Sequence, residues 1–351
     1  MLRVAGEALL RWFRLQARDL PWRGAGRSPY RVLVSEFMLQ QTQVDRVAPR
    51  FERFVRRFPT LEDLAAAAED EVVEEWSGLG YYRRARLLHR LARAVADAGG
   101  GLPVSSAELE KLPGIGPYTA AAVASLASGE AVPVLDGNVM RVGARVLAMS
   151  GDPRAAAGRR RLEAWVRGLF AEAPAGEVNE ALMELGATLC TPLDPACGRC
   201  PLASVCAARA EGRPLAYPPP RRRRVTVDLR WAAACAVAPD GRWLLHRIDE
   251  GPILRGLWLP PLAELEEGAD PPLEARRVLA GVAADAAMLA PAVRHSITHR
   301  RIEVVPLRFT VEADAPPSDA WRWADPSSPG LPTSTLLAKL VSAVASLDRD
   351  A

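Results

Sequence analysis

The fold is decided by residues 105–128, which read SSAELEKLPGIGPYTAAAVASLAS. The opening Ser-x-x-Glu is a capping box, which predicts that a helix begins there. The Leu-Pro-Gly-Ile-Gly run cannot continue that helix, and Pro117 suits the first turn of a second one. Gly114 and Gly116 let the backbone approach a phosphate, and the amides at the start of the second helix would point at that anion. The stretch therefore predicts a phosphate-binding helix–hairpin–helix motif.

Four of the five cysteines fall within 17 residues and have the spacing C-x6-C-x2-C-x5-C; they are Cys190, Cys197, Cys200 and Cys206. Thiolates in one short loop can converge on one metal centre. Zinc sites more often use two separated C-x2-C pairs, whereas one pair between two outer cysteines suits the four corners of a [4Fe–4S] cube. The spacing therefore favours a metal centre, and the neighbouring motifs described below favour this cluster over zinc. Cys235 falls in an apolar stretch and is predicted to be a core residue.

Length and composition set the outer limits. The chain has 351 residues, 49% of them hydrophobic and 25% charged, with a net charge of +3. This length is near the limit for one hydrophobic core and predicts two domains. We find no apolar run long enough to cross a membrane and no apolar segment of a secretion signal, and we expect a monomer in the cytoplasm. The charge does not exclude a polyanion partner, since one face can be basic.

The hydrophobic pattern changes near residue 225. Before it, helical spacing predicts amphipathic helices within residues 43–57, 70–97, 105–128 and 157–187. After it, alternation predicts strands over 225–237, 242–248 and 301–312, with helices over 272–284 and 334–347. Between them, Arg221–Arg224 end a Pro/Arg-rich linker that either contacts phosphates or is simply solvated. We therefore predict an all-α region over 1–206, a linker over 207–227 and an α+β domain over 228–351.

Six segments resemble the endonuclease III superfamily of base-excision DNA glycosylases, and within it the adenine-excising MutY branch. They are Leu20–Arg23, Val34–Val44, Gly78–Arg86, Leu112–Ala120, Leu135–Val139 and the cysteine loop, in family order. The resemblance implies a multi-domain protein: an all-α helix–hairpin–helix glycosylase domain with a [4Fe–4S] loop, followed by an α+β Nudix-like domain. A six-helix barrel would cover about 20–130, and the cluster part would combine the N-terminal helix with about 131–206. It also implies a bacterial, nucleoid-associated DNA repair enzyme.

The implied reaction is hydrolysis of the N-glycosidic bond of an adenosine flipped out of double-stranded DNA, where adenine is mispaired with 8-oxoguanine or G. Glu36 lies in an apolar run, so we expect burial to raise its pKa, as a general acid at neutral pH requires. The resemblance makes it the acid that protonates adenine N7. It makes Asp136, with Asn138, the group that stabilises the oxocarbenium ion. From the residues alone, Asp136 is a helix N-cap.

Tyr118 decides between two reaction classes. Lyases of the superfamily carry a lysine at this position as a Schiff-base nucleophile. Tyrosine has no amine, so we predict a monofunctional enzyme that leaves an abasic site. We expect the Tyr118 hydroxyl to form a hydrogen bond near Asp136 or the departing sugar.

The resemblance implies further site residues. Arg18, Trp22, Arg23 and Glu180 would line the adenine pocket. Leu39, Gln40, Gln41, Thr42 and Tyr81 would contact DNA beside the opposite base, with Gly114 and Gly116 at a phosphate. Ile297, Thr298 and His299 would read 8-oxoguanine, although the family commonly has Phe-Ser-His there. Without the family, these residues are equally well a polar helix face, core packing and a surface turn.

Three other readings stay open. A related helix–hairpin–helix glycosylase could act on another mispaired base, such as T opposite G, and Tyr118 does not exclude it. A non-catalytic DNA-binding protein would not need both Glu36 and Asp136. A nucleotide hydrolase would need the acidic Nudix box, which is missing from residues 272–283.

Overall fold

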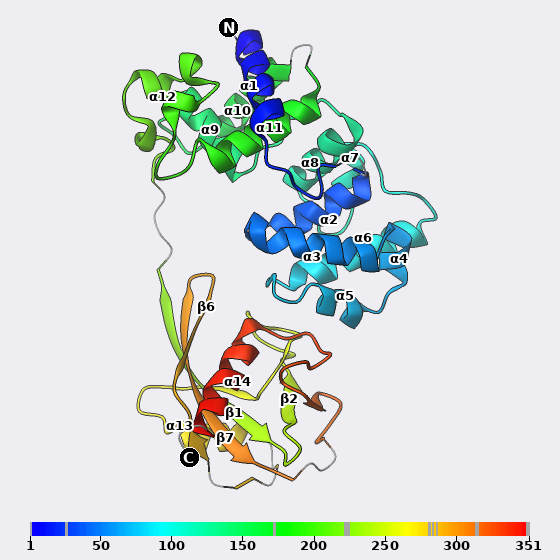
Figure 1. Cartoon of the computed structure of the whole chain (residues 1–351), viewed down its shortest axis with the longest axis vertical. Coiled ribbons are helices and arrows are strands. Elements are labelled where there is room, and N and C mark those ends of the chain that lie inside the picture. Colours follow the sequence, from blue (N-terminus) through cyan, green and yellow to red (C-terminus); the bar gives the residue numbers. More distant parts are fainter. Residues whose placement is uncertain are drawn as a thin grey trace. The chain divides into compact units, whose positions relative to one another are not determined.

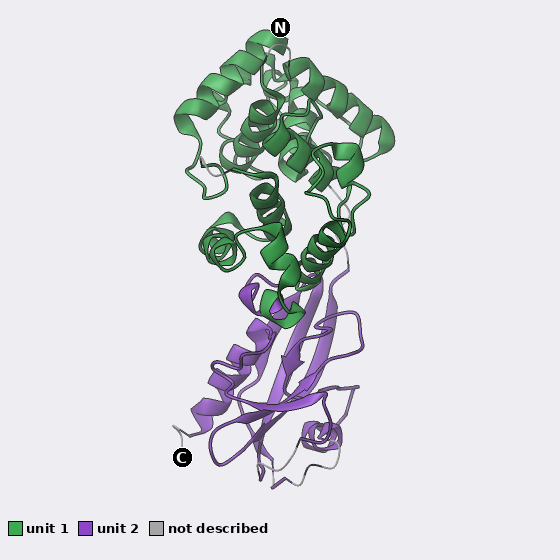
Figure 2. Ribbon diagram, turned by 90° about the vertical axis from the view of Figure 1, so that its right-hand side faces the viewer, with its two compact units in different colours: residues 1–72, 81–222 green, residues 73–80, 223–351 purple. Residues whose placement is uncertain are grey.

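The computed structural model describes residues 2–24, 27–170, 173–220, 225–279, 282, 284–285, 287–312 and 316–348. Its helices and strands are labelled in Figure 1. The chain divides into two compact units, residues 1–72 with 81–222, and residues 73–80 with 223–351 (Figure 2). The arginine run at 221–224 lies outside the described residues. No helix in the described ranges is both long and apolar enough to cross a membrane.

The first unit is helical, which confirms the all-α prediction. Its α-helices are α1 (Leu2–Gln16), α2 (Pro29–Leu39), α3 (Val44–Arg57), α4 (Leu61–Ala66), α5 (Glu69–Glu75), α6 (Arg83–Asp97), α7 (Ser106–Leu109), α8 (Pro117–Ser128), α9 (Gly137–Val146), α10 (Ala156–Phe170), α11 (Ala175–Thr188) and α12 (Ala207–Ala210). The last residues of α5, from Val73 on, are grouped with the second unit. Three short 3-10 turns are η1 (Cys197–Arg199), η2 (Ala203–Val205) and η3 (Pro214–Ala216).

The hairpin is present between α7 and α8. Ser105 accepts a hydrogen bond from the amide of Glu108, as the capping box predicts. Gly114 has a φ of 83°, which glycine adopts readily, and the side chain of Leu87 lies 3.1 Å from where a Cβ would stand. Gly116 is the N-cap of α8 and Pro117 begins that helix. The predicted helix–hairpin–helix motif is confirmed.

Two predicted helical segments are interrupted. Residues 70–97 form α5 and α6 with a loop between them, because Gly78 and Gly80 have φ values of 86° and 70°. Residues 157–187 divide into α10 and α11, and Pro174 is the N-cap of the second helix. Proline is tolerated only in the first turn of a helix, so one continuous helix cannot run through Pro174.

One buried core of the first unit joins residues far apart in sequence. It contains Leu9 of α1, Val139 of α9, Leu162 of α10 and Leu185 of α11, each with no exposed surface. The outer cysteines, Cys190 and Cys206, pack against this core. The N-terminal helix is therefore part of the same layer as the cysteine loop.

The second unit is a mixed sheet between two helices, which confirms the predicted α+β class. Its elements are β1 (Val227–Val237), β2 (Trp243–Arg247), β3 (Trp258–Leu259), β4 (Leu262–Glu264), α13 (Pro271–Val278), β5 (Met288–Leu289), β6 (Val293–Ile297), β7 (Arg300–Thr310), β8 (Trp321–Ala324) and α14 (Thr335–Leu347). The strand order is β3-β2-β1-β7-β5, with β4 paired to β1, β6 to β7 and β8 to β2.

The centre of this sheet is the parallel pair β1 and β7, in register from Val227 opposite Arg300 to Val237 opposite Thr310. Alternate residues of β1 face opposite sides, so α14 covers one face and α13 the other. Cys235 is fully buried in β1, as predicted. The helix expected over 272–284 ends at Val278, and residues 280, 281 and 283 of the expected range lie outside the described residues.

Candidate active site and cysteine loop

A cavity of about 510 Å³ opens in the first unit, which is large enough for a small ligand. It is bordered by the end of α2, the starts of α8 and α9, the middle of α11, and the loop before α2. Its lining includes most of the predicted residues: Arg18, Trp22, Arg23, Glu36, Leu39, Gln40, Gln41, Thr42, Tyr118, Asp136, Asn138 and Glu180. Among the described residues, Tyr81, Gly114 and Gly116 are not part of this lining, and Ile297–His299 belong to the second unit.

Glu36 is buried in α2 with 4% of its surface exposed, which confirms the expectation from its apolar neighbours. Burial raises the pKa of Glu36 to about 7; a hydrogen bond from Tyr118 lowers it, while the charges of Asp136 and Glu180 raise it further. The Tyr118 hydroxyl donates to Glu36 Oε2 over 2.6 Å. The hydrogen bond of Tyr118 is therefore made to Glu36 and not to Asp136 itself, because Tyr118 stands in the first turn of α8, and α8 packs against α2, which holds Glu36.

Asp136 is the N-cap of α9, as predicted, and the helix begins at Gly137. Its Oδ1 accepts from the amide of Val139 over 2.6 Å, and its Oδ2 accepts from the side chain of Asn138 over 2.8 Å. Burial raises the pKa of Asp136, whereas these donors lower it. The bonds fix the direction of the carboxylate, which faces the same cavity as Glu36.

The side chain of Asn138 is in turn held by Arg141 and by the close packing of α11. Arg141 donates to Asn138 Oδ1 over 2.9 Å and to the carbonyl of Gly186 over 2.8 Å. A Cβ at position 186 would lie 2.5 Å from the Cβ of Asn138, so only glycine lets α11 come this close to α9. The packing of two helices therefore sets the orientation of the Asp136 carboxylate.

Two glutamates of α11 anchor the loop before α2. Glu184 accepts from Arg18 Nε over 2.7 Å and from Arg23 Nη2 over 2.9 Å, and its side chain has no exposed surface. Glu180 accepts from Arg23 Nε over 2.9 Å and from Arg27 Nη2 over 2.7 Å. The arginines lower the pKa of Glu184 despite its burial. Three guanidinium groups and two carboxylates thus form one continuous network in the cavity wall.

Glu184 and Arg27 were not predicted from the sequence. Glu184 lies four residues after Glu180, on the same face of a helix. That spacing is visible in the sequence, but the three arginine partners lie more than 150 residues earlier, and nothing local links them. Trp22, on the anchored loop, packs edge-to-face on Phe51 with 5.5 Å between ring centroids and also lines the cavity.

The segments predicted to contact DNA have unusual backbone conformations. Gln41 and Tyr81 have φ values of 60° and 51°, in the left-handed region that non-glycine residues seldom adopt. Both side chains are exposed. Gln40 differs, because its amide group donates to Thr119 Oγ1 over 3.4 Å and is half-buried.

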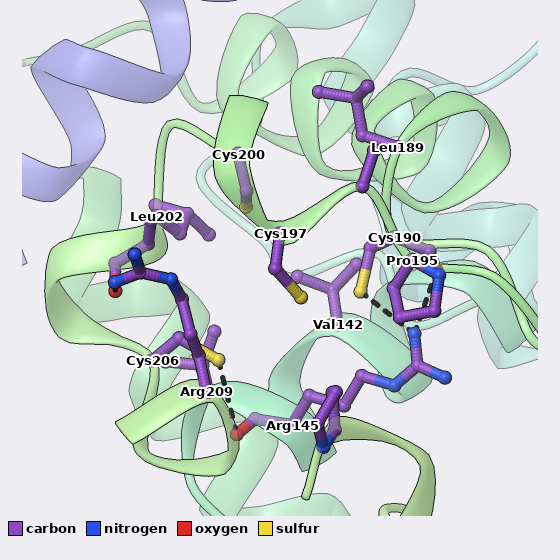
Figure 3. A pocket seen from close by; sticks show the side chains of 14 residues that line it. Val142, Arg145, Leu189, Cys190, Pro195, Cys197, Cys200, Leu202, Cys206 and Arg209 are labelled. Atoms are coloured by element: carbon purple, nitrogen blue, oxygen red, sulfur yellow. Dashed lines mark hydrogen bonds between the residues drawn. The ribbon is translucent and has the colours of Figure 1, made fainter. Parts of the chain in front are cut away.

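The four cysteines of the loop are free and half-buried, and they line one pocket with Val142, Arg145, Leu189 and Leu202. Figure 3 shows their sulfur atoms directed into this common space. Burial raises the pKa of Cys206, and that of Cys200 to about 11. Arg145 Nη1 donates to Cys190 Sγ over 3.3 Å. Within the described ranges, no group of three or more His, Cys, Asp or Glu side chains is arranged to hold a single metal ion.

Ile297, Thr298 and His299 form the turn of the β6–β7 hairpin. Thr298 has a φ of 56°, and its hydroxyl donates to the carbonyl of Ile297 over 2.7 Å. The carbonyl of His299 accepts from the amide of Val227 over 3.0 Å. The turn is therefore held by its bond to the last residue of β6 and by its bond to the first residue of β1.

Comparison with known proteins shows which class of DNA repair protein the chain resembles. Residues 34–167 match the family model described as HhH-GPD superfamily base excision DNA repair protein. A solved structure of a thermostable thymine-DNA glycosylase matches 60% of this chain and 97% of its own, with 28% identity and a TM-score of 0.53. The family match falls within the helical region.

Curated relatives define the branch. The adenine DNA glycosylase of Mycobacterium tuberculosis is 46% identical over 220 residues, which cover 62% of this chain and 72% of the relative. The human adenine DNA glycosylase is 46% identical over 211 residues, which cover 58% of this chain and 39% of the relative. The chain therefore belongs to the adenine DNA glycosylase family, within the endonuclease III superfamily. It spans less than half the length of the mammalian and plant relatives that it matches.

Proposed function

We propose that this chain is a monofunctional DNA glycosylase that removes adenine mispaired with 8-oxoguanine or G from double-stranded DNA. The observation that supports this most directly is the pair of carboxyl groups in one cavity. Glu36 has its pKa raised to about 7, whereas Asp136 accepts hydrogen bonds from Val139 and Asn138. Two carboxyl groups in different environments are the arrangement that glycosidic bond cleavage uses.

The proposed reaction begins with an adenosine flipped into the cavity, since its reacting atoms are inaccessible in stacked DNA. Glu36 gives its proton to adenine N7, so the base can leave with the electron pair of the C1′–N9 bond. The Asp136 carboxylate faces the resulting oxocarbenium ion and stabilises its positive charge. Water then adds to C1′ and gives its proton to the Glu36 carboxylate, which restores the acid.

Tyr118 and the arginine network support the other details of the proposal. The Tyr118 hydroxyl donates to Glu36 and offers no amine for a Schiff base, so the product is an abasic site without strand cleavage. Arg18, Trp22, Arg23 and Glu180 would form the wall of the adenine pocket. Gly114, Gly116 and the amides at the start of α8 would bind a phosphate.

The proposal extends to the opposite base. Gln41 and Tyr81 are exposed and would enter the DNA beside the base that loses its partner, with Leu39, Gln40 and Thr42 behind them. The second unit would read 8-oxoguanine through Ile297, Thr298 and His299. Thr298 and His299 supply a hydroxyl and an imidazole for this contact.

A [4Fe–4S] cluster fits the cysteine pocket. Four thiol groups from one loop face it. Burial disfavours the charged form of Cys200 and Cys206 unless a positive group is bound. Cys190, Cys197, Cys200 and Cys206 would hold the cluster, whose chemistry here would be structural support or electron transfer.

One experiment tests the proposed reaction. Duplexes carrying A opposite 8-oxoguanine, A opposite G, and T opposite G are incubated with the protein and analysed before and after alkali. We expect cleavage of the adenine strand only after alkali, and its loss in Glu36→Gln. The second candidate, excision of T opposite G, is supported by the likeness to a thymine-DNA glycosylase. Cleavage of the thymine strand alone would favour it.

A further inference from the structure

Arg84 is a buried cation between the two segments proposed to enter the DNA. It stands at the start of α6 and only 7% of its surface is exposed. Nη1 donates to the carbonyls of Phe37 and Met38 over 2.7 and 2.9 Å, and also to the carbonyl of Gln40. Nη2 donates to Thr42 Oγ1 over 3.0 Å. One guanidinium group thus contacts both the end of α2 and the segment that follows it.

The carbonyls that Arg84 binds are those that need a partner. The last carbonyl groups of a helix receive no hydrogen bond from an amide of the same helix. A cation near that end stabilises the helix, because the end carries partial negative charge. Phe37 and Met38 belong to the last turn of α2, and Gln40 is its C-cap. Helices often end with a left-handed glycine just beyond this point, but here the residue is Gln41, with a φ of 60°. The end of α2 therefore relies on Arg84.

The same guanidinium contacts the second segment. Its central carbon lies 5.3 Å from the centroid of the Tyr81 ring, which is a cation–π distance. Tyr81 is also left-handed, with a φ of 51° and 41% of its surface exposed. Such conformations are strained and persist only where neighbouring groups hold them. Gln41 and Tyr81 therefore share one support.

We propose that Arg84 is a positioning residue that holds Gln41 and Tyr81 together in the geometry that fills the gap left by the flipped adenine. This inference rests on the proposed function for the role of those two side chains. Arg84 itself contacts no base in this scheme. Lysine could keep the charge, but it lacks the planar fork that reaches three carbonyls and a hydroxyl at once.

The test measures flipping without base removal. In a Glu36→Gln background, 2-aminopurine replaces the target adenine opposite 8-oxoguanine, and its fluorescence rises when it leaves the stack. We expect Arg84→Lys to reduce the fluorescent, flipped fraction about tenfold, the scale of one or two lost charge-assisted hydrogen bonds. Arg90→Lys is the matched control, since Arg90 is exposed on the same helix, and it should flip like the parent protein.

Two further measurements separate positioning from general damage. Gln41→Gly removes the side chain but suits the left-handed backbone, so it should lose flipping while its melting temperature stays at or above that of the parent. Arg84→Lys should retain a folded, cooperative thermal transition and lose much less flipping when an abasic site stands opposite, because no opposite base then needs to be held. Equal flipping by Arg84→Lys and the parent would overturn the proposal, as would equal losses on both duplexes.

These outcomes are distinct from those of the excision assay. If the wild-type protein fails to excise adenine, the proposed reaction is wrong, whatever Arg84 does. If it excises adenine and Arg84→Lys flips normally, only the inference about Arg84 is wrong. If the Glu36→Gln protein flips no base in any duplex, the inference is also wrong.

Discussion

The hydroxyl of Tyr118 donates a hydrogen bond to Oε2 of Glu36 over 2.6 Å. The two residues come from different helices, and two opposing effects act on the pKa of Glu36. Burial raises the pKa of Glu36 to about 7, whereas the donated hydrogen bond favours the carboxylate and lowers it. The proton on Glu36 is therefore available near neutral pH, where a general acid is most effective.

This balance predicts a pH profile for excision. Only protonated Glu36 can act as the acid, so the single-turnover rate should fall as pH rises through about 7. Tyr118→Phe removes the donor that lowers the pKa of Glu36, so the alkaline limb should move to higher pH. Rates are measured under single-turnover conditions at about pH 5.5–9. An unchanged limb, or one moved to lower pH, would contradict the assignment.

The same group links stability to pH. The pKa of Glu36 rises from 4.5 to about 7 on folding, so its contribution is fully present below 4.5 and is lost as pH rises through about 7. The difference corresponds to roughly 3 kcal/mol. Glu36→Gln does not titrate and should therefore gain stability relative to the wild type at alkaline pH. Urea unfolding at about pH 5 and 8.5 measures this difference, and Glu62→Gln, at an exposed position, is the control. A parallel pH dependence in wild type and Glu36→Gln would exclude the buried acid.

Gly186→Ala should impair the site indirectly, by displacing Asn138, which holds Asp136. The new Cβ would lie 2.5 Å from the Cβ of Asn138, so Asn138 must move and its bond to Asp136 must change. We expect the excision rate to fall about tenfold or more, with the protein still folded, since small displacements of catalytic groups have effects of this size. Gly100→Ala, where an added Cβ meets nothing within 4 Å, should behave like the wild type. Normal excision by Gly186→Ala would show that the Asn138 contact has no role.

Glu184→Gln should destabilise the protein. The Glu184 side chain is fully buried and binds Arg18 and Arg23. Removing one partner of a buried ion pair leaves charges uncompensated and typically costs about 3–5 kcal/mol. Glu163→Gln, whose side chain is 40% exposed in its pair with Arg159, should cost less than about 1 kcal/mol. Chemical denaturation of both variants is the measurement, and equal losses would show that burial of the network is not important.

Replacement of single cysteines should distinguish the proposed cluster ligands from Cys235, which is a core residue. Cys197→Ser should lose iron and the brown absorbance expected of an iron–sulfur protein. Cys235→Ser should keep both, since Cys235 is buried in β1 of the second unit. Iron and zinc are quantified in the purified protein by metal analysis. A colourless, zinc-containing and active wild type would contradict the cluster assignment.

The sequence predicted the local structure best where a short motif determines the backbone. The glycines and proline of 112–117 specify the hairpin, and Asp136 specifies the start of α9 through its own side chain. The burial of Glu36 followed from its apolar neighbours in one helix. Each of these depends on a few adjacent residues.

Contacts between distant segments were not predictable in the same way. The partner of Tyr118 depends on how α8 crosses α2, and the sequence contains no local signal for that crossing. Arg84 was part of a recognised motif, but its role depends on where α2 ends in space. Glu184 and Arg27 were missed because ion pairing across more than 100 residues leaves no local pattern.

The position of α1 has a consequence for how the chain is made. Arg14 of α1 pairs with Glu177 of α11, 163 residues later, and the apolar side of α1 packs in the same core as α9, α10 and α11. A growing polypeptide exposes this helix long before its partners leave the ribosome. Closing so long a loop is also slow relative to local helix formation. The apolar side of α1 therefore stays without its native partners through most of the synthesis of the first unit.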